Sequence, residues 1–352
     1  MTSSTSTVFQ LDEPLDAIPD QLFDDEPVLT RYPRLREFRA KLGNTTLMTA
    51  PSPAGGATIL GKCEFENPAG SIKDRPAYGM LCRAILEHGD NPEPLKLVDY
   101  SGGSLVRAFA HLRRLTDIPM RFVVPSSISD TWRAVIEESG IEVVTVDAST
   151  GIMGTIERAT EIAAVEPGWT MLHQMRNVAN VQMHQHTTGR EIVEQLDGRT
   201  PTYLVSAIGT GGTLAGTARA LRAVYPDVRV VGNTPREMPY GTEEPPNGLP
   251  KFAGSGGLGL KVCQPLVAEL FPDATHQDVP YDELLDAMVR FEEATGRRIG
   301  TSAAANWLVS WQLAEQLSPD DIVVTIFADA GSPEEWQRAY HQRDGKPRTD
   351  GA

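Results

Sequence analysis

The chain has 352 residues, 40% of them hydrophobic, which is enough for one large α/β unit or for two domains that share a cleft. Its net charge of −15 comes from 32 basic and 47 acidic residues, and this acidity argues against a nucleic-acid partner. No apolar run approaches the roughly 20 residues of a membrane helix, and three scattered cysteines are too few for a disulfide framework or a metal cluster.

The two ends of the chain differ in composition from the middle. Residues 1–28 are rich in Ser and Thr, then acidic and interrupted by proline, without the basic start and apolar stretch of a secretory signal. They predict a solvated tail; the alternative is an arm that packs on a partner subunit or on the cleft. With a short helix expected over 32–41, we treat residues 1–41 as an N-terminal acidic extension. Residues 341–352 predict a disordered tail. Without a secretory signal, the expected location is cytoplasmic.

Between these ends, short β-branched runs alternate with amphipathic helical patterns, which is typical of an α/β fold with parallel sheets flanked by helices. In such folds ligands bind beyond the carboxyl ends of the strands. Strands are expected at Leu95–Tyr100, Met120–Pro125, Glu142–Asp147, Tyr203–Ile208, Val228–Asn233 and Ile322–Ala328. Helices are expected at Arg75–His88, Leu105–Thr116, Ser129–Ser139, Met153–Glu166, Gly189–Leu196, Leu214–Tyr225, Tyr281–Thr295 and Ala303–Gln316.

The first strand-to-helix turn with candidate chemistry carries Lys73. The turn Asn67-Pro68-Ala69-Gly70 leads directly into the helix that holds this lysine. A lysine at a helix N-terminus can have a lowered pKa because the helix dipole disfavours its charge, and it is then a better amine nucleophile. Taken alone, such a lysine is more often an ordinary surface charge.

A glycine-rich loop follows the strand that ends near Ile208. Its residues are Gly209-Thr210-Gly211-Gly212-Thr213, and a helix begins immediately after them. Glycines let backbone N–H groups crowd around an anion, the threonines add hydroxyl donors, and the helix directs its positive end to the same place. The loop has no lysine of the nucleotide-binding type, but it would suit a phosphate monoester. A glycine-rich turn without a ligand is the alternative.

In combination these segments resemble one family. The run Asn67–Arg75 resembles the N-P-A/T-G-S-x-K-D-R motif of fold type II enzymes that use pyridoxal 5'-phosphate (PLP), and Gly209–Thr213 resembles their G-T-G-G-T loop. Further matches occur in order at Gly43–Leu47, at Gln174–Ile192 and at Gly300–Ser302, and the match covers about residues 42–337. It points to the cysteine synthase and cystathionine beta-synthase (β-substituted alanine synthase) branch.

The resemblance implies roles for named residues. Lys73 would hold PLP as a Schiff base and act as the base at the substrate Cα, while Gly209, Thr210, Gly211, Gly212 and Thr213 would bind the cofactor phosphate. Ser302 would bind the pyridine nitrogen. The loop Ser101-Gly102-Gly103-Ser104, together with the Gln174 amide, would bind the substrate carboxylate, and Gly103 would also lie beside the cofactor. No metal is implied.

Two segments depart from the family pattern. Gly103 stands where the family has an asparagine that hydrogen-bonds the cofactor, and this opens space above the ring. Near the C-terminus, Ala328–Pro333 stands where the family has P-x-S-G-x-R-Y, so that Ala330 replaces the serine. Both departures leave the substrate pair open.

The predicted activity is β-replacement on an O-activated L-serine (acetyl- or phosphoserine) via aminoacrylate, with a sulfur or nitrogen nucleophile. An enzyme of this kind is a transferase or lyase of amino-acid biosynthesis. The alternatives are β-elimination and a non-catalytic PLP-binding homologue. The expected partners are these small molecules, with neither nucleic acid nor membrane, and the resemblance implies a homodimer. We expect a large domain from residues 42–66 and 178–340 that binds the phosphate, and a small domain from 67–177 that carries Lys73 and the carboxylate loop.

Overall fold

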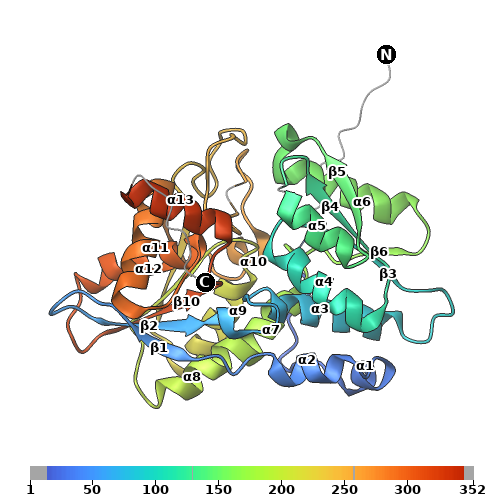
Figure 1. Ribbon diagram of the computed structural model, residues 1–352. Coiled ribbons are helices and arrows are strands. Elements are labelled where there is room, and N and C mark those ends of the chain that lie inside the picture. The colour runs from blue at the N-terminus through green and yellow to red at the C-terminus, as the bar shows by residue number, and fades with distance from the viewer. Residues whose placement is uncertain (1–13, 129, 257, 345–352) are drawn as a thin grey trace.

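The computed structural model describes residues 14–128, 130–256 and 258–344, and its strands form two sheets (Figure 1). The larger sheet has the order β1-β2-β10-β7-β8-β9 and is parallel except for β1, which pairs antiparallel with β2. The smaller sheet, β5-β4-β3-β6, is parallel throughout. The strands are β1 Leu47–Ala50, β2 Thr58–Cys63, β3 Lys96–Tyr100, β4 Met120–Pro125, β5 Glu142–Val146, β6 Trp169–Met171, β7 Tyr203–Ala207, β8 Arg229–Pro235, β9 Thr275–Val279 and β10 Ile322–Phe327.

Helices cover both faces of each sheet. Successive strand residues point to opposite faces, so neighbouring residues of one strand enter different cores. In β7, Leu204 packs into a core with residues of α9, while Val205 packs into a core with residues of α11 and α12. In β4, Phe122 faces α3 and α4, and Val123 faces α6. The helices are α1 Glu26–Arg31, α2 Leu35–Lys41, α3 Asp74–His88, α4 Ser104–Thr116, α5 Asp130–Glu138, α6 Gly151–Val165, α7 Val178–Met183, α8 Arg190–Leu196, α9 Gly212–Val224, α10 Pro265–Ala268, α11 Tyr281–Thr295, α12 Thr301–Ala314 and α13 Pro333–Asp344, with a π-helical turn η4 at His184–Gly189.

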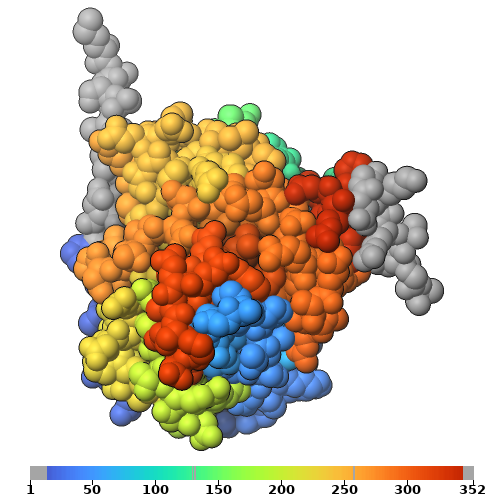
Figure 2. Space-filling view, turned by 90° about the vertical axis from the view of Figure 1, so that its left-hand side faces the viewer, coloured from blue at the N-terminus to red at the C-terminus, as the bar shows by residue number. Residues whose placement is uncertain are grey.

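The central strand β10 shows why the fold forms. All six residues of Ile322–Phe327 are buried, and the run is almost entirely apolar because helices cover it on both sides. Figure 2 views the end of this sheet, where the segment before β2 (blue) lies beside the segment before β10 (orange-red). There Ala57 N donates to Ala314 O and Thr58 N donates to Asp321 O, each at 3.0 Å. This pairs the N-terminal hairpin with the C-terminal part of the sheet.

The expected α/β architecture is confirmed, and each expected strand and helix is present with shifts of at most two residues at its ends, except that the helix expected over 32–41 begins at Leu35. The sequence patterns missed four strands, β1, β2, β6 and β9. The predicted disordered tail is wrong for residues 341–344, which continue α13, and its remaining residues lie outside the described part of the chain. Of the three cysteines, Cys63 and Cys82 are buried and Cys263 is partly exposed.

Residues 14–23 are anchored on the rest of the chain, so the prediction of a solvated tail is wrong for them. Leu15 and Ile18 pack on the core beneath α9, and Leu22 and Phe23 pack on the core of the small sheet. Hydrogen bonds support these contacts: Leu15 N donates to Glu269 Oε2 at 3.1 Å, Arg176 Nη2 to Pro14 O at 3.1 Å and Gln182 Nε2 to Gln21 O at 3.0 Å. Residues 1–13 lie outside the described part.

In the part of the chain that the structure describes, no helix combines the length and the apolar character needed to cross a membrane.

Candidate active site

A cavity of ≈ 810 Å³ lies where the carboxyl ends of strands from both sheets face each other. Its walls include residues that follow β3, β4, β7 and β10, which is the position where ligands bind in parallel α/β folds. All but one of the predicted site residues line this cavity: Lys73, Ser101, Gly102, Gly103, Ser104, Gln174, Gly209, Thr210, Gly211, Thr213 and Ser302. Gly212 lies behind the wall as the first residue of α9, and its N–H donates to Thr210 Oγ1 at 3.4 Å.

Lys73 immediately precedes α3, and its segment is held on the end of β10. Ile72 N donates to Ala328 O at 2.8 Å, and Ser71 forms a bridge with Asp329. A Cβ placed on Gly209 would lie 3.8 Å from the Lys73 Nζ, so the amine reaches the glycine-rich loop. Burial lowers the pKa of Lys73, and the charge of Asp329 opposes this only in part. The amine is therefore favoured in its neutral, nucleophilic form.

The loop Gly209–Thr213 is shaped by contacts with η4 and α7. Gly211 adopts φ +91°, a conformation that suits glycine. The Asn180 Nδ2 donates to Thr210 Oγ1 at 2.9 Å, and Thr213 Oγ1 lies 3.2 Å from His184 Nε2. Both threonine hydroxyls are thus oriented by buried polar side chains at the start of the 13-residue helix α9.

His184 is buried between two threonines, because its Nδ1 also lies 3.0 Å from Thr188 Oγ1. Burial, reinforced by the charges of Arg75 and Lys73, holds the pKa of His184 well below its ordinary value. A neutral imidazole has one donor and one acceptor nitrogen, so it can fix the Thr213 hydroxyl without adding charge to the loop.

The candidate carboxylate loop Ser101–Ser104 connects β3 to α4. Gly103 N donates to Ser101 Oγ at 3.3 Å, and a Cβ placed on Gly103 would have no neighbour within 4 Å. The Gln174 Nε2 donates to the backbone carbonyl of Tyr100, the last residue of β3. Gln174 is therefore fixed against the loop, and its second amide hydrogen is the donor that could serve a ligand.

Ser302 lies in the first turn of α12 and is 6% exposed, at the cavity wall. The adjacent Thr301 hydroxyl bonds to Glu335, and Ala253 N donates to Thr301 Oγ1 at 2.9 Å. These bonds tie the start of α12 both to α13 and to the loop around Gly254. The loop around Gly254 packs closely on the candidate phosphate loop, since a Cβ on Gly209 would lie 2.4 Å from Gly254 O.

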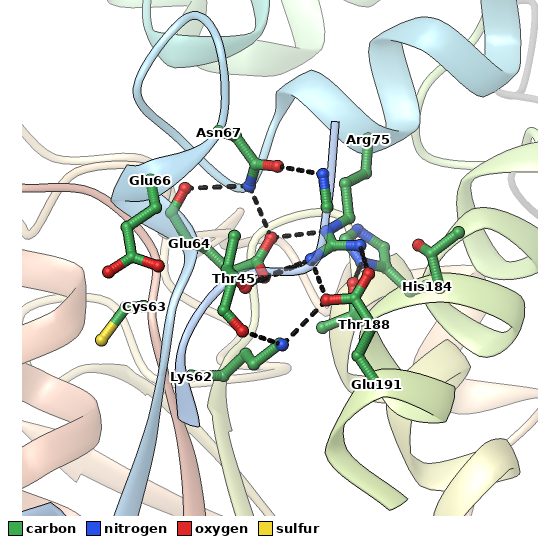
Figure 3. A network of polar contacts seen from close by, with 12 residues as sticks. Thr45, Lys62, Cys63, Glu64, Glu66, Asn67, Arg75, His184, Thr188 and Glu191 are labelled. Atoms are coloured by element: carbon green, nitrogen blue, oxygen red, sulfur yellow. Dashed lines mark hydrogen bonds and ion pairs between the residues drawn. The ribbon is translucent and has the colours of Figure 1, made fainter. Parts of the chain in front are cut away.

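A network of buried charges supports the helix that begins after Lys73 (Figure 3). Arg75 bonds to Glu64 through Nη2–Oε1 at 2.6 Å and to Glu191 through Nη1–Oε1 at 2.6 Å, and Lys62 Nζ lies 2.8 Å from Glu191 Oε2. The side chains of Lys62, Glu64 and Arg75 are fully buried, and that of Glu191 is 12% exposed. Asn67 joins the network, because its Nδ2 donates to Glu64 Oε2 at 2.8 Å. The network fixes both ends of the turn that presents Lys73.

Four residues at or behind the cavity had no assigned role in the sequence interpretation: Arg107, Asn180, His184 and Asp329. Asn180 and His184 lie in the motif run that starts at Gln174, and this was the available signal for them. Asp329 follows β10, and burial, with a smaller effect of Glu335, raises its pKa to about 6. Arg107 lies one turn into α4, with nothing local in the sequence to mark it.

The residues present fit a phosphate-bearing cofactor that is joined to an amine. The glycine loop leaves backbone N–H donors at the start of α9, and a Cβ at Gly209 would fill the space beside them. The amine of Lys73, whose pKa is lowered by burial, lies at the same loop. Within the described residues, no group of three or more His, Cys, Asp and Glu side chains is arranged to hold a metal ion.

Comparisons with known proteins agree with this geometry. Residues 39–329 match the family model described as "Pyridoxal-phosphate dependent enzyme". The chain is 31% identical over 320 residues to the cysteine synthase of Aquifex aeolicus, which covers 87% of this chain and 92% of that protein. It is 29% identical over 280 residues to the cysteine synthase of Staphylococcus aureus, covering 78% and 86%.

Solved structures share the fold. The crystal structure of O-ureido-L-serine synthase superimposes with a TM-score of 0.74 at 24% identity, covering 90% of this chain and 96% of that one. The O-acetyl serine sulfhydrylase isoform 3 from Entamoeba histolytica gives a TM-score of 0.76 at 22% identity, covering 90% and 93%.

Proposed function

The chain belongs to the pyridoxal-phosphate-dependent enzymes, in the cysteine synthase family, and from its site we propose that it replaces the activated β-substituent of an L-serine derivative by a sulfur or nitrogen nucleophile. The observation that carries this proposal is the shared cavity of Lys73, the Gly209–Thr213 loop and the Ser101–Ser104 loop. The relatives named cysteine synthase support replacement over β-elimination or a non-catalytic role.

PLP would be held by Lys73 through its aldehyde, by the Gly209–Thr213 loop through its phosphate and by Ser302 through its ring nitrogen, and when bound it supplies an electron sink for the bonds at Cα. The fit of each group rests on the placement described above. Thr210 and Thr213, oriented by Asn180 and His184, would donate to the phosphate. Neutral Ser302 would leave the ring nitrogen without an added charge.

The remaining residues act on the substrate. The Ser101 and Ser104 hydroxyls, the loop N–H groups and the Gln174 amide would hold the α-carboxylate, so that the Cα–H bond faces Lys73. Lys73, with a pKa lowered by burial, would take this proton at Nζ and later return it to Cα. The loop Ala253–Gly256, which lines the cavity, would limit the access of water.

Lys73→Ala tests this function. The purified wild-type protein should show the absorption band of lysine-bound PLP, and with acetylserine and sulfide it should release cysteine and acetate. Lys73→Ala should lose both the band and the turnover. Lys251→Ala is the matched control, because Lys251 also lines the cavity but donates to Asn247 and Leu249. A band that persists in Lys73→Ala, or a wild-type band that no serine derivative alters, would contradict the proposal.

Three further expectations are proposed with this function. The sheet membership of the strands supports a large domain of residues 42–66 and 178–340 and a small domain of 67–177. A homodimer and a cytoplasmic location rest on the family resemblance.

A further inference from the structure

We propose that Arg107 makes the enzyme selective for a serine derivative whose leaving group is an anion, namely the phosphate of O-phospho-L-serine. This inference rests on the proposed β-replacement and names its substrate class. It comes from an arginine in the cavity wall that neither the phosphate loop nor the carboxylate loop needs.

Arg107 lies one turn into α4, directly after the candidate carboxylate loop, and it lines the same cavity as Lys73. Its Nη2 donates to the carbonyl of Gly70 at 3.1 Å, and Gly70 lies three residues before Lys73. Its Cζ lies 5.7 Å from the centre of the Trp132 ring, which also lines the cavity. The guanidinium is thus positioned between the carboxylate loop and the segment that carries the base.

The donors of Arg107 are not used up by the protein. The Nε is buried without a hydrogen-bond partner among the described residues, and none of their carboxylates forms an ion pair with this side chain within 4.0 Å. Asp329 and Asp74 are near enough for the charge of Arg107 to act against the rise of their pKa values. Burial raises these values to about 6 and about 7, and neither carboxylate lies within 4.0 Å of the guanidinium, so neither occupies its donors.

The other cavity cations are placed differently, and Arg338 is exposed. Lys73 has its own role, Lys251 donates to Asn247 and Leu249, and Arg338 Nη1 reaches the Tyr281 hydroxyl at 3.5 Å. The two anions of the proposed function, the cofactor phosphate and the α-carboxylate, have loops of their own. A guanidinium with free donors is the preferred partner of a further phosphate or carboxylate, since its planar donors match two oxygens at once.

The leaving group is the best candidate for this third anion. When the substrate Cα faces Lys73, Cβ lies one bond beyond Cα and carries the leaving group. Arg107 is hydrogen-bonded to Gly70 in the turn that leads to Lys73, so its guanidinium lies on the same side of the cavity. The Cβ–O bond breaks with its electron pair going to phosphate, the Cα proton goes to Lys73 and returns, and a new Cβ–S bond forms from hydrogen sulfide. The products are cysteine and inorganic phosphate, with no change in oxidation state.

The test compares two substrates in three proteins. For wild type, Arg107→Lys and Arg107→Gln, kcat/KM is measured with O-phospho-L-serine and with O-acetyl-L-serine at fixed sulfide. Wild type should prefer phosphoserine. Arg107→Gln should lose about 30- to 100-fold more with phosphoserine than with acetylserine, because only the phosphate loses a charge-assisted bond. Arg107→Lys should recover part of this loss.

Binding provides a second readout. Inorganic phosphate should compete with phosphoserine in wild type, and Arg107→Gln should weaken this inhibition in parallel. Arg114→Gln is the matched control, since Arg114 is an exposed arginine on the same helix outside the cavity wall. The PLP band and the melting temperature show whether each variant is folded.

The outcomes separate the two proposals. Turnover of acetylserine with no preference for phosphoserine, or an equal loss with both substrates in folded Arg107→Gln, overturns the role of Arg107 and leaves the proposed function standing. No turnover of either substrate by wild type overturns the proposed function itself.

Discussion

Glu191→Gln removes one carboxylate from the buried network beside Lys73. Arg75 would keep Glu64 as its partner, whereas Lys62 would lose its ion pair and keep only the Thr45 carbonyl and the Gln195 amide oxygen, 2.9 Å away. The network would then hold two cations and one anion, with Lys62, Arg75 and Glu64 fully buried. We expect a large loss of stability because the remaining charge cannot reach water.

The magnitude follows from two independent routes. Burial alone would raise the pKa of Glu191, but Arg75 and Lys62 overcome this and lower it to about 2 from the ordinary 4.5. This difference corresponds to about 3 kcal/mol of stability for the ionised form. Removal of one member of a buried ion pair generally costs about 3–5 kcal/mol. The two values agree, so we expect a loss of about 3 kcal/mol at pH 7.

The direction of the Glu191 pKa shift also predicts how the stability loss depends on pH. Since the pKa is lower in the folded protein, this stabilisation is present above about pH 4.5 and is lost as the pH falls toward 2. The difference between wild type and Glu191→Gln should therefore narrow to about 1 kcal/mol at pH 3.

Urea unfolding of the holoenzyme, followed by tryptophan fluorescence at pH 7 and pH 3, measures both effects. Glu194→Gln is the control, because Glu194 lies on the same helix in an exposed pair with Arg190 and should change stability by less than about 0.5 kcal/mol. If Glu191→Gln lost no more than Glu194→Gln at pH 7, or if its loss were independent of pH, the reasoning would be refuted.

Three further variants test the cavity. Gly103→Asn should shift the PLP absorption band and keep a melting temperature close to wild type, because Gly103 has φ −148° and no neighbour at its Cβ position. A lower melting temperature would contradict the open space at Gly103. Gly209→Ala should lose the cofactor, because its Cβ would lie 2.4 Å from Gly254 O. Asp329→Asn should stabilise the protein at pH 8 by about 3 kcal/mol in urea unfolding, because the pKa of Asp329 is raised from 3.8 to about 6. The stability that this shift gives is present below pH 3.8 and is lost as the pH rises through 6. An equal effect at pH 4 and pH 8 would contradict that assignment.

The sequence allowed the α/β fold and most of the cavity wall to be predicted, because both depend on local signals. The buried runs of β4, β7 and β10 mark the strands, and the loops around Lys73 and Gly209 follow strand ends or turns. The missed elements lack such a signal. β9 is an edge strand whose first four residues are at least partly exposed, and β6 has only three residues. α7 is buried on all sides, so it shows no amphipathic period.

The contacts that orient the site could not be predicted from local patterns. Asn180 meets Thr210 and His184 meets Thr213 only because α9 packs closely on α7 and η4. Gly216 makes this approach possible, since a Cβ there would lie 2.4 Å from Val181 O. Arg107 belongs to the cavity for a similar reason, because its partner Gly70 lies 37 residues earlier in the chain.

The anchored segment of residues 14–23 has a consequence for synthesis on the ribosome. Its contacts reach Arg83, Arg176, Gln182 and finally Glu269, which is 254 residues after Leu15. At about 5–20 residues per second, residue 15 emerges many seconds before its last partner is made. Residues 14–23 are therefore secured only after most of the later chain has been translated, and until then their hydrophobic side chains are open to chaperones.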